Sequence, residues 1–466
     1  MEPTAKRKTA ECKFGVSPIL PLIALLCVMG GTGMAADTRL LTFSGAVIAA
    51  LENNHELRSQ RNSYSAKQAD VGIARSMLLP KISFEERYLR TANPAYAFMT
   101  KLNQGRIEST DFVPDSMNRP DAVSDFQSAV SFEQPLFMRK AYIGLDMSKI
   151  EAAVSEENLK RKQEEVAFRV VQNCLLADTA ARYVDIVEKG LEDAREHQRL
   201  AETRFGAGLG LYSDTLRAAT AVAEAEQKRV SAGKNLRVAR LALGLLIGSA
   251  DAVEVTGEIP ALPLRKIEEL RAQSLTRKDV QSLELRAANA RNSVKLAEAN
   301  YFPSVGMGGA YQLNDHNRPF GSEGDSWQVT AALRWEIFDG TKRKHERTKA
   351  RFEVSEAEEY LAGMREMVSF QVEEAWLSLE EAKQNSELAR KALATAEEGR
   401  RLVKVRYEGS LSPIVDMLDA QVSFDHARAN LVARENEYKL AIANLCFASG
   451  TILDDLKLKE PGGGTE

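Results

Sequence analysis

Apolar residues recur at helical spacing over long stretches of this chain. From position 357 to 382 they follow one another at intervals of three and four residues, and Glu, Lys and Arg fill most positions between them. This pattern is the seam of a coiled coil, and a helix over about 341–407 extends on the order of 100 Å at 1.5 Å per residue. It therefore predicts a rod or part of a tube, because so long a helix cannot fold into a compact globule. The seam consists of Ala357, Leu361, Met364, Val368, Val372, Ala375, Leu379 and Ala382.

The distribution of proline agrees with long helices. No proline occurs between positions 135 and 260 or between 319 and 413. Since proline breaks helix interiors, both spans can form helical hairpins, and we place their turns near 206–213 and 408–413.

Two short segments alternate with the period of a strand instead. Residues 326–338 and 125–137 each place apolar side chains on one face and mostly polar ones on the other. Trp327 and Trp335 are separated by roughly 26 Å at about 3.3 Å per residue, which is close to the ~25 Å apolar band of an outer-membrane barrel. A strand packed on a water-soluble core gives the same alternation, so one segment alone leaves both interpretations open. The predicted membrane-facing aromatic residues are Phe126, Phe132, Trp327 and Trp335.

Two further strands are predicted near 82–90 and 304–313, directly after Leu79-Pro80 and Phe302-Pro303. Glu86 would then lie on the face assigned to lipid, which counts against the first of them. The stretch 91–124 is predicted to be a long loop that joins the first pair of strands, and the second pair has a shorter one.

The chain is an internal duplication. Residues 74–82 return at 297–305, and the strand at 126–137 returns at 327–338. The order is the same in both halves: helix, strand, strand, long helix, turn, returning helix. The predicted division is a first structural repeat over 37–261, a second over 262–449 and a C-terminal tail over 450–466.

The first 36 residues have the order of a secretory signal. Four basic residues precede the apolar run 19–29, and small residues follow, so that cleavage falls after Ala35 or Ala36. A membrane anchor is the alternative, for which the run is short. Export places the protein outside the cytoplasm, most simply in a bacterial envelope. Two cysteines remain, Cys174 and Cys446, and we expect both to pack as small apolar residues.

Whole-chain averages exclude several classes of protein. A net charge of −4 and a pI near 6.0 give no support for nucleic-acid binding. The chain has no phosphate-cradling Gly-Lys-Ser/Thr loop and no Gly-x-Ser-x-Gly elbow, and its five histidines lack close metal-ligand spacing. We therefore expect neither an enzyme nor a cofactor or metal site.

Predicted strands that span a membrane require several copies of the chain. Lipid offers no hydrogen bonds, so a membrane sheet cannot leave its edges unpaired. Each chain supplies four strands, whereas the smallest common barrel has eight. Two chains would supply eight strands and three chains twelve.

The ordered motifs together resemble the outer membrane factor (TolC-like) family. They are the two helix-to-strand junctions, the strand ends 134–137 and 335–338, the turns 204–209 and 406–411, and the segment 414–420. The resemblance implies a mainly α fold with a small β part. Long coiled-coil helices would form a periplasmic α-helical barrel that continues into a transmembrane β-barrel of twelve strands in a homotrimer.

By the same resemblance, the protein would be a passive duct in the outer membrane with a large periplasmic portion. It would serve a tripartite efflux or type I secretion system, joined through a periplasmic adaptor to an inner-membrane transporter of the RND or ABC type. A periplasmic coiled-coil adaptor or scaffold is the alternative, and the cargo (drug, metal ion or protein) stays open.

The resemblance also assigns roles around the two turns. Asp416 and Asp419 match acidic rings that narrow the tunnel entrance, although two aspartates at a helix start also suit the helix dipole. Tyr407 and Asp214 match a pair that hydrogen-bonds between hairpins in the closed mouth, and Ser213 matches a hydroxyl residue beside it. Ser412 stands where the family gate carries an arginine. The hairpin tips that would dock the adaptor are Gly206, Gly208, Leu209, Gly409, Ser410 and Leu411.

Overall fold

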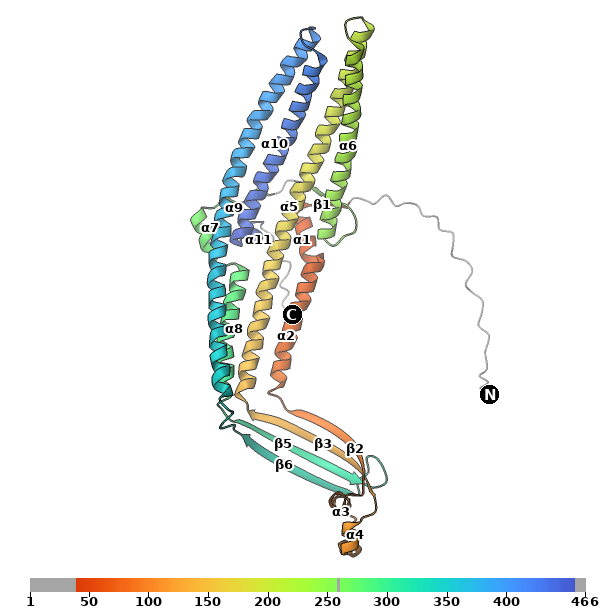
Figure 1. Ribbon diagram of the computed structural model, residues 1–466, viewed down its shortest axis with the longest axis vertical. Coiled ribbons are helices and arrows are strands. Elements are labelled where there is room, and N and C mark those ends of the chain that lie inside the picture. Colours follow the sequence, from red (N-terminus) through yellow and green to blue (C-terminus); the bar gives the residue numbers. More distant parts are fainter. Residues whose placement is uncertain (1–38, 258–259, 457–466) are drawn as a thin grey trace, which may run out of the picture. The chain divides into compact units, whose positions relative to one another are not determined.

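A computed structural model describes residues 39–257 and 260–456 (Figure 1). The predicted signal at 1–36 and the end of the predicted tail, 457–466, lie outside the described residues. The helices are α1 (Phe43–Asn53), α2 (His55–Ser76), α3 (Pro94–Asn103), the 3-10 helix η1 (Ser109–Phe112), α4 (Pro114–Asn118), α5 (Arg139–Gly206), α6 (Tyr212–Leu246), α7 (Ile267–Ser274), α8 (Lys278–Ala299), α9 (Lys342–Glu408), α10 (Ile414–Ser449) and α11 (Ile452–Asp455). The strands are β1 (Arg39–Thr42), β2 (Lys81–Thr91), β3 (Val123–Phe137), β4 (Val253–Thr256), β5 (Ser304–Asp315) and β6 (Gly324–Arg334).

The predicted long helices are confirmed. α5 has 68 residues and α9 has 67. Along α9, the predicted seam is half-buried from Ala357 to Met364 and buried from Val368 to Ala382. α9 packs on α8 and α10, and α5 packs on α2, α6, α8 and α10. Among the described residues, no helix has both the length and the apolar character that a membrane span needs.

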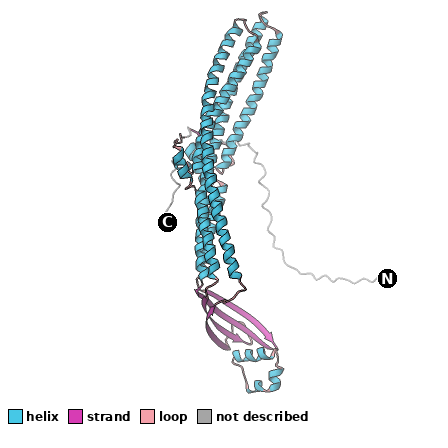
Figure 2. Ribbon diagram, turned by 60° about the vertical axis from the view of Figure 1, so that its left-hand side comes forward, coloured by secondary structure: helices cyan, strands magenta, loops and turns pink. Residues whose placement is uncertain are grey.

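Four strands form one antiparallel sheet, drawn in magenta in Figure 2, and their order is β2-β3-β5-β6 (Figure 1). The register fixes which side chains share a face, because residues directly opposite one another point the same way. The apolar face carries Ile82, Phe84, Tyr88, Phe126, Val130, Phe132, Tyr311, Trp327 and Val329. The polar face carries Lys81, Ser83, Glu85, Arg87, Gln127, Ser131, Glu133, Gln312, Asn314, Gln328 and Thr330.

The predicted end of the fourth strand is wrong. β6 stops at Arg334, so Trp335 lies outside it, and the two tryptophans do not mark the ends of one strand face. The Trp335 ring N–H instead donates to the carbonyl of Tyr301 at 3.1 Å. The buried Arg343 guanidinium donates to the carbonyls of Glu336 and Ile337, both at 2.8 Å. These bonds take the backbone out of the sheet although the alternation of apolar residues continues.

The predicted loop at 91–124 is also wrong in part, because it contains α3, η1 and α4. The Asn93 side chain accepts a hydrogen bond from the Tyr96 N–H at 3.3 Å, and Pro94 occupies the first turn. Both features favour a helix start. An ion pair of 2.7 Å between Lys101 and Asp111 then ties α3 to η1.

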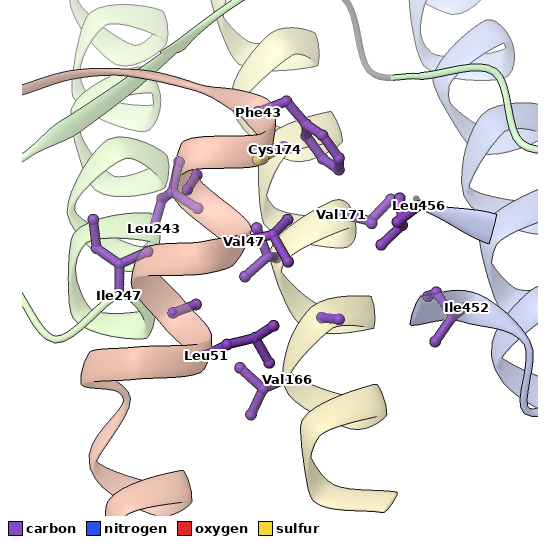
Figure 3. Close-up of a cluster of buried hydrophobic side chains, with 14 of the residues drawn as sticks. Phe43, Val47, Leu51, Val166, Val171, Cys174, Leu243, Ile247, Ile452 and Leu456 are labelled. Atoms are coloured by element: carbon purple, nitrogen blue, oxygen red, sulfur yellow. The ribbon is translucent and has the colours of Figure 1, made fainter. Parts of the chain in front are cut away.

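The main apolar core lies where α1, α5, α6, α10 and α11 meet (Figure 3). Cys174 and Cys446 are buried in it as free thiols, as predicted, and burial raises the pKa of each to about 12. The short parallel pair β1–β4 beside this core was not predicted from the sequence. It contributes Val253, which is fully buried.

Candidate functional site: the mouth formed by the two hairpins

Both helical hairpins end in the same backbone turn. The Leu209 N–H bonds to the Arg204 carbonyl at 2.9 Å, and the Leu411 N–H bonds to the Arg406 carbonyl at 2.8 Å. Such a six-to-one bond closes a helix when the intervening residue is left-handed. Gly208 has φ +72°, and in the second hairpin the same place is taken by Ser410 with φ +62°.

Both tips expose apolar side chains. Leu209 is 71% exposed and Leu411 is 73% exposed. Gly206 and Gly409 are exposed beside them. All six predicted tip residues therefore lie at the two turns and are accessible, which a docking surface requires.

Just inside the tips, the two hairpins share a small apolar cluster. Its buried members come from all four helices, and Ile414 is completely buried. Burial of these side chains holds the hairpins together at the mouth, because each fully buried aliphatic side chain stabilises by about 1.5–3 kcal/mol. The cluster consists of Ala201, Ala218, Tyr407, Ile414 and Met417.

Arg204 is a polar link between the hairpins at their tips. Its guanidinium donates to the Tyr407 carbonyl and to the Ser410 hydroxyl, both at 2.8 Å. It also lies over the Tyr407 ring, 4.9 Å from the centroid. The equivalent Arg406 is exposed, and the described part of the chain shows no hydrogen bond or ion pair of its side chain. The recurring arginines therefore differ: Arg204 joins the hairpins and Arg406 does not.

Tyr407 is buried, with 4% of its surface exposed. Burial raises the pKa of its hydroxyl; the nearby charge of Asp214 adds to this rise and that of Arg204 opposes it. Within one protomer, the described residues show no hydrogen bond between Tyr407 and Asp214. Ser213 is exposed beside Asp214. The Ser412 hydroxyl is buried without a hydrogen-bond partner among the described residues.

Asp416 and Asp419 lie in the first turns of α10 and are both exposed. They stand on the side of the helix away from the buried Ile414 and Met417. In the part of the chain that the structure describes, neither carboxylate is within ion-pair distance of a basic group. Their charge is therefore free to act on the space outside this cluster.

A polar network deeper between the hairpins was missed from the sequence. The Gln421 amide donates to Asp193 at 3.0 Å and to Asp425 at 3.1 Å, and Arg400 lies 3.3 Å from Asp193. Burial raises the pKa of Asp425, and burial lowers that of the neighbouring His197. His197 lies on α5, as Asp193 does, and its buried Nε2 atom has no hydrogen-bond partner among the described residues.

The sheet ends in two free edges. β2 and β6 are its outermost strands, and each pairs on one side only. Trp327 is 74% exposed and Val329 is 60% exposed on the apolar face of β6. The backbone N–H and C=O groups on such an open edge can pair with a strand of another chain.

Known proteins are similar to this chain in sequence. The sequence model of the outer membrane efflux protein family matches residues 47–249 and 270–451. Outer membrane protein OprJ of Pseudomonas aeruginosa is 25% identical over 417 residues, which are 86% of this chain and 82% of that protein. Outer membrane efflux protein BepC of Brucella suis is 21% identical over 449 residues, 93% and 91% of the two chains.

Solved structures agree in shape. The crystal structure of the outer membrane protein VceC from Vibrio cholerae superposes with a TM-score of 0.71 at 16% identity, covering 88% of this chain and 96% of that one. That likeness confirms the predicted fold class of long helices joined to a small sheet.

Proposed function

The chain belongs to the outer membrane efflux protein family, and from that premise we propose that it is the outer-membrane duct of a tripartite efflux or type I secretion system. It conducts substrates passively from a transporter–adaptor complex across the periplasm and the outer membrane. The protein is located in the outer membrane, with a large periplasmic helical portion. The proposal includes the secretory signal at 1–36 and the two structural repeats at 37–261 and 262–449.

The free edges of the sheet carry the proposal of a homotrimer. In lipid, every backbone N–H and C=O group needs a partner within protein, so β6 of one copy pairs with β2 of the next. Four strands cannot enclose a lumen, and three copies supply the twelve that the family resemblance implies. The apolar face, with Phe126, Phe132 and Trp327, then faces lipid, and the polar face lines the lumen. Trp335 lies at the helix end of this band.

The mouth is the proposed gate and docking site. The exposed tip leucines would bury against a periplasmic adaptor, which links the duct to an inner-membrane transporter of the RND or ABC type. Asp416 and Asp419 form acidic rings, and Tyr407, Asp214 and Ser213 hold the mouth closed. The transporter sets the cargo and supplies the energy, so the duct needs no nucleotide site.

The experiment that tests the function is a measurement of assembly and conduction on the full chain. Detergent-extracted protein is expected to run as a trimer in native mass spectrometry and to form channels in planar lipid bilayers. Release from cell envelopes without detergent, as a non-conducting monomer or dimer, would instead support the periplasmic adaptor or scaffold.

Replacing Arg204 with alanine is expected to raise the single-channel conductance by about twofold. The substitution removes both hydrogen bonds to the second hairpin and the contact with the Tyr407 ring; each bond to a charged group stabilises by about 1.5–3 kcal/mol when buried and by less when exposed, as at Ser410. Arg406→Ala is the matched control, because it removes the equivalent charge without a contact between the hairpins. Equal conductance in both variants would place the gate elsewhere.

A further inference from the structure

The two loops at the helix-distal end of the sheet differ greatly in size. Residues 92–122, here called the insert, join β2 to β3, and residues 316–323 join β5 to β6. Both leave the same end, because Thr91 pairs with Val123 and Asn314 pairs with Gly324. The insert carries α3 and α4 at this end in both views of the chain (Figures 1 and 2).

The insert is fastened to the polar face of the sheet. The side chain of Gln104, only 1% exposed, donates to the Ser124 carbonyl at 2.8 Å and to Asp125 at 2.9 Å. Asp125 is itself 4% exposed and also accepts from the Asn314 amide at 2.9 Å. Asp125 and Asn314 belong to the polar face, since they alternate with Phe126 and Leu313. A buried and fully paired network of this kind fixes the position of what it holds.

The insert also crosses the whole sheet. It begins at the β2 edge, and α3 contacts both β3 and β6. A Cβ atom on Gly324 of β6 would come within 2.0 Å of the Asn103 carbonyl oxygen, so only glycine permits this approach. The end of α3 therefore rests directly on the strand farthest from its own origin.

The short loop leans the opposite way. The ring of Phe320 stacks on that of Phe84 at 6.1 Å between centroids, and its backbone N–H bonds to Glu86 at 3.4 Å. Phe84 and Glu86 lie on the apolar face. Ser128 donates to Glu86 as well, which explains how a carboxylate is accommodated there. The short loop thus covers the apolar face of the sheet, and the insert covers the polar face.

The insert presents an apolar surface away from the sheet. Ala97 and Thr100 are the buried residues of α3, which contacts β3, β6 and α4, and at 100° per residue Met99 and Leu102 point to the opposite side of this helix. Each of these two is 50% exposed. Further exposed apolar residues of the insert are Tyr96, Phe112, Val113 and Met117.

The width of the barrel, compared with that of a helix, indicates what covers the exposed apolar side of α3. Twelve strands about 4.8 Å apart and tilted by about 40° enclose a barrel roughly 24 Å across. A helix with its side chains is about 10 Å wide. Three helices lying on the inner wall therefore reach the axis and meet one another.

We propose that the inserts of the three protomers pack together through the side of α3 that carries Met99 and Leu102, and close the outer end of the barrel. The three inserts would form an outer gate, separate from the periplasmic mouth. The exposed side of α3 in each copy is covered by the inserts of the two neighbouring copies. The proposal rests on the proposed trimeric duct. It accounts for an apolar surface that would otherwise line an aqueous lumen.

Cysteine cross-linking tests the contact. In the full-length trimer, Met99→Cys is expected to give a covalent dimer band in over half of the protein after mild oxidation, because three thiols meet at the axis. Phe320→Cys is the matched control: it is 69% exposed at the same end of the sheet but on the outer face, and should remain monomeric on denaturing gels. The native thiols of Cys174 and Cys446 are buried and do not interfere. Absence of the Met99→Cys dimer in a confirmed trimer overturns the outer gate alone, whereas absence of the trimer overturns the proposed function.

Access from outside tests closure independently of the periplasmic mouth. Gln328→Cys places a thiol on the polar face within the barrel. A bulky maleimide added to intact cells should label it at least tenfold faster when the insert is replaced by the sequence of residues 316–323. Gln104→Leu, which keeps the insert but removes its fastening, should raise the rate severalfold and serves if the replacement fails to fold. Equal labelling rates in native and Gln104→Leu proteins would contradict the proposal.

Discussion

Replacing Arg277 with alanine is expected to lower the free energy of unfolding by roughly 3–5 kcal/mol, the range for breaking a buried ion pair from one side. Arg277 is 4% exposed. Its guanidinium donates to the Ala448 carbonyl at 2.9 Å, to the Gln371 side chain at 2.8 Å and to Asp279 at 2.6 Å. The substitution leaves a carbonyl at the end of α10 and a largely buried carboxylate without these partners.

Unfolding of the detergent-solubilised protein in guanidinium chloride, followed by the circular dichroism of its helices, measures the loss in free energy of unfolding. Arg365→Ala is the matched control, because that guanidinium makes an exposed pair with Glu284 at 2.7 Å. Exposed pairs contribute about 0–1 kcal/mol. Similar losses in both variants would mean that the Arg277 network contributes no more than a surface contact.

The cost of the Arg277 substitution is expected to shrink in acid. Burial alone would raise the pKa of Asp279, but the Arg277 and Arg161 guanidinium groups outweigh it and hold that pKa below its usual 3.8. A carboxyl group with a lowered folded pKa stabilises above its unfolded pKa, and this contribution is lost as the pH falls through the folded value. The difference between native and Arg277→Ala proteins should therefore narrow from pH 7 to pH 3. If the difference in the free energy of unfolding between the two proteins stayed constant with pH, the ion pair with Asp279 would not be the source of the stabilisation by Arg277.

The same position shows how far the sequence repeat reaches into the structure. Arg277 corresponds to Asn54, 223 residues earlier. The Asn54 amide donates to the Leu246 carbonyl at the end of α6 at 2.8 Å, as Arg277 donates to Ala448 at the end of α10. Two unlike side chains thus join equivalent helix ends, which residue matching could not reveal.

Periodicity predicted the elements that bury one continuous stripe or face. It located α9 and β3 because their patterns run for many residues without interruption. It failed where tertiary contacts override the pattern, as at Trp335, where Arg343 draws the chain out of the sheet. It also failed at α3, which lies within the stretch 91–124 predicted as a loop and begins at the Asn93 cap and Pro94.

The mouth was predictable in part for a similar reason. Gly208 marked a turn because its left-handed backbone favours glycine, but Ser410 at the equivalent place carries no such signal. Arg204 and Tyr407 lie 203 residues apart, and their contact depends on which faces of two hairpins meet. No local pattern encodes that choice.

Replacing both Asp416 and Asp419 with alanine is expected to weaken block of the single-channel current by a trivalent cation at least tenfold. Both carboxylates are exposed on one face of α10, away from the apolar cluster, and three copies would bring six of them around the tunnel entrance. Rings of acidic side chains concentrate cations and repel anions. A tenfold change corresponds to about 1.4 kcal/mol, a modest demand, since even in water two unit charges 4 Å apart interact by about 1 kcal/mol.

Titration of hexamminecobalt in planar bilayers at low and high salt measures that block. Because the Debye length falls from about 10 Å at 0.1 M salt to about 3 Å at 1 M, block of the native channel should weaken with added salt, whereas the double variant should show little salt dependence. Glu398→Ala is the control, since that exposed carboxylate on α9 is paired with Arg401 at 2.7 Å. Unchanged block in the double variant, or an equal loss in the control, would mean that the blocking cation binds elsewhere. A loss confined to the double variant would instead locate the narrow, negatively charged point of the duct at the first turns of α10, on the side of this helix away from the cluster that holds the hairpins together.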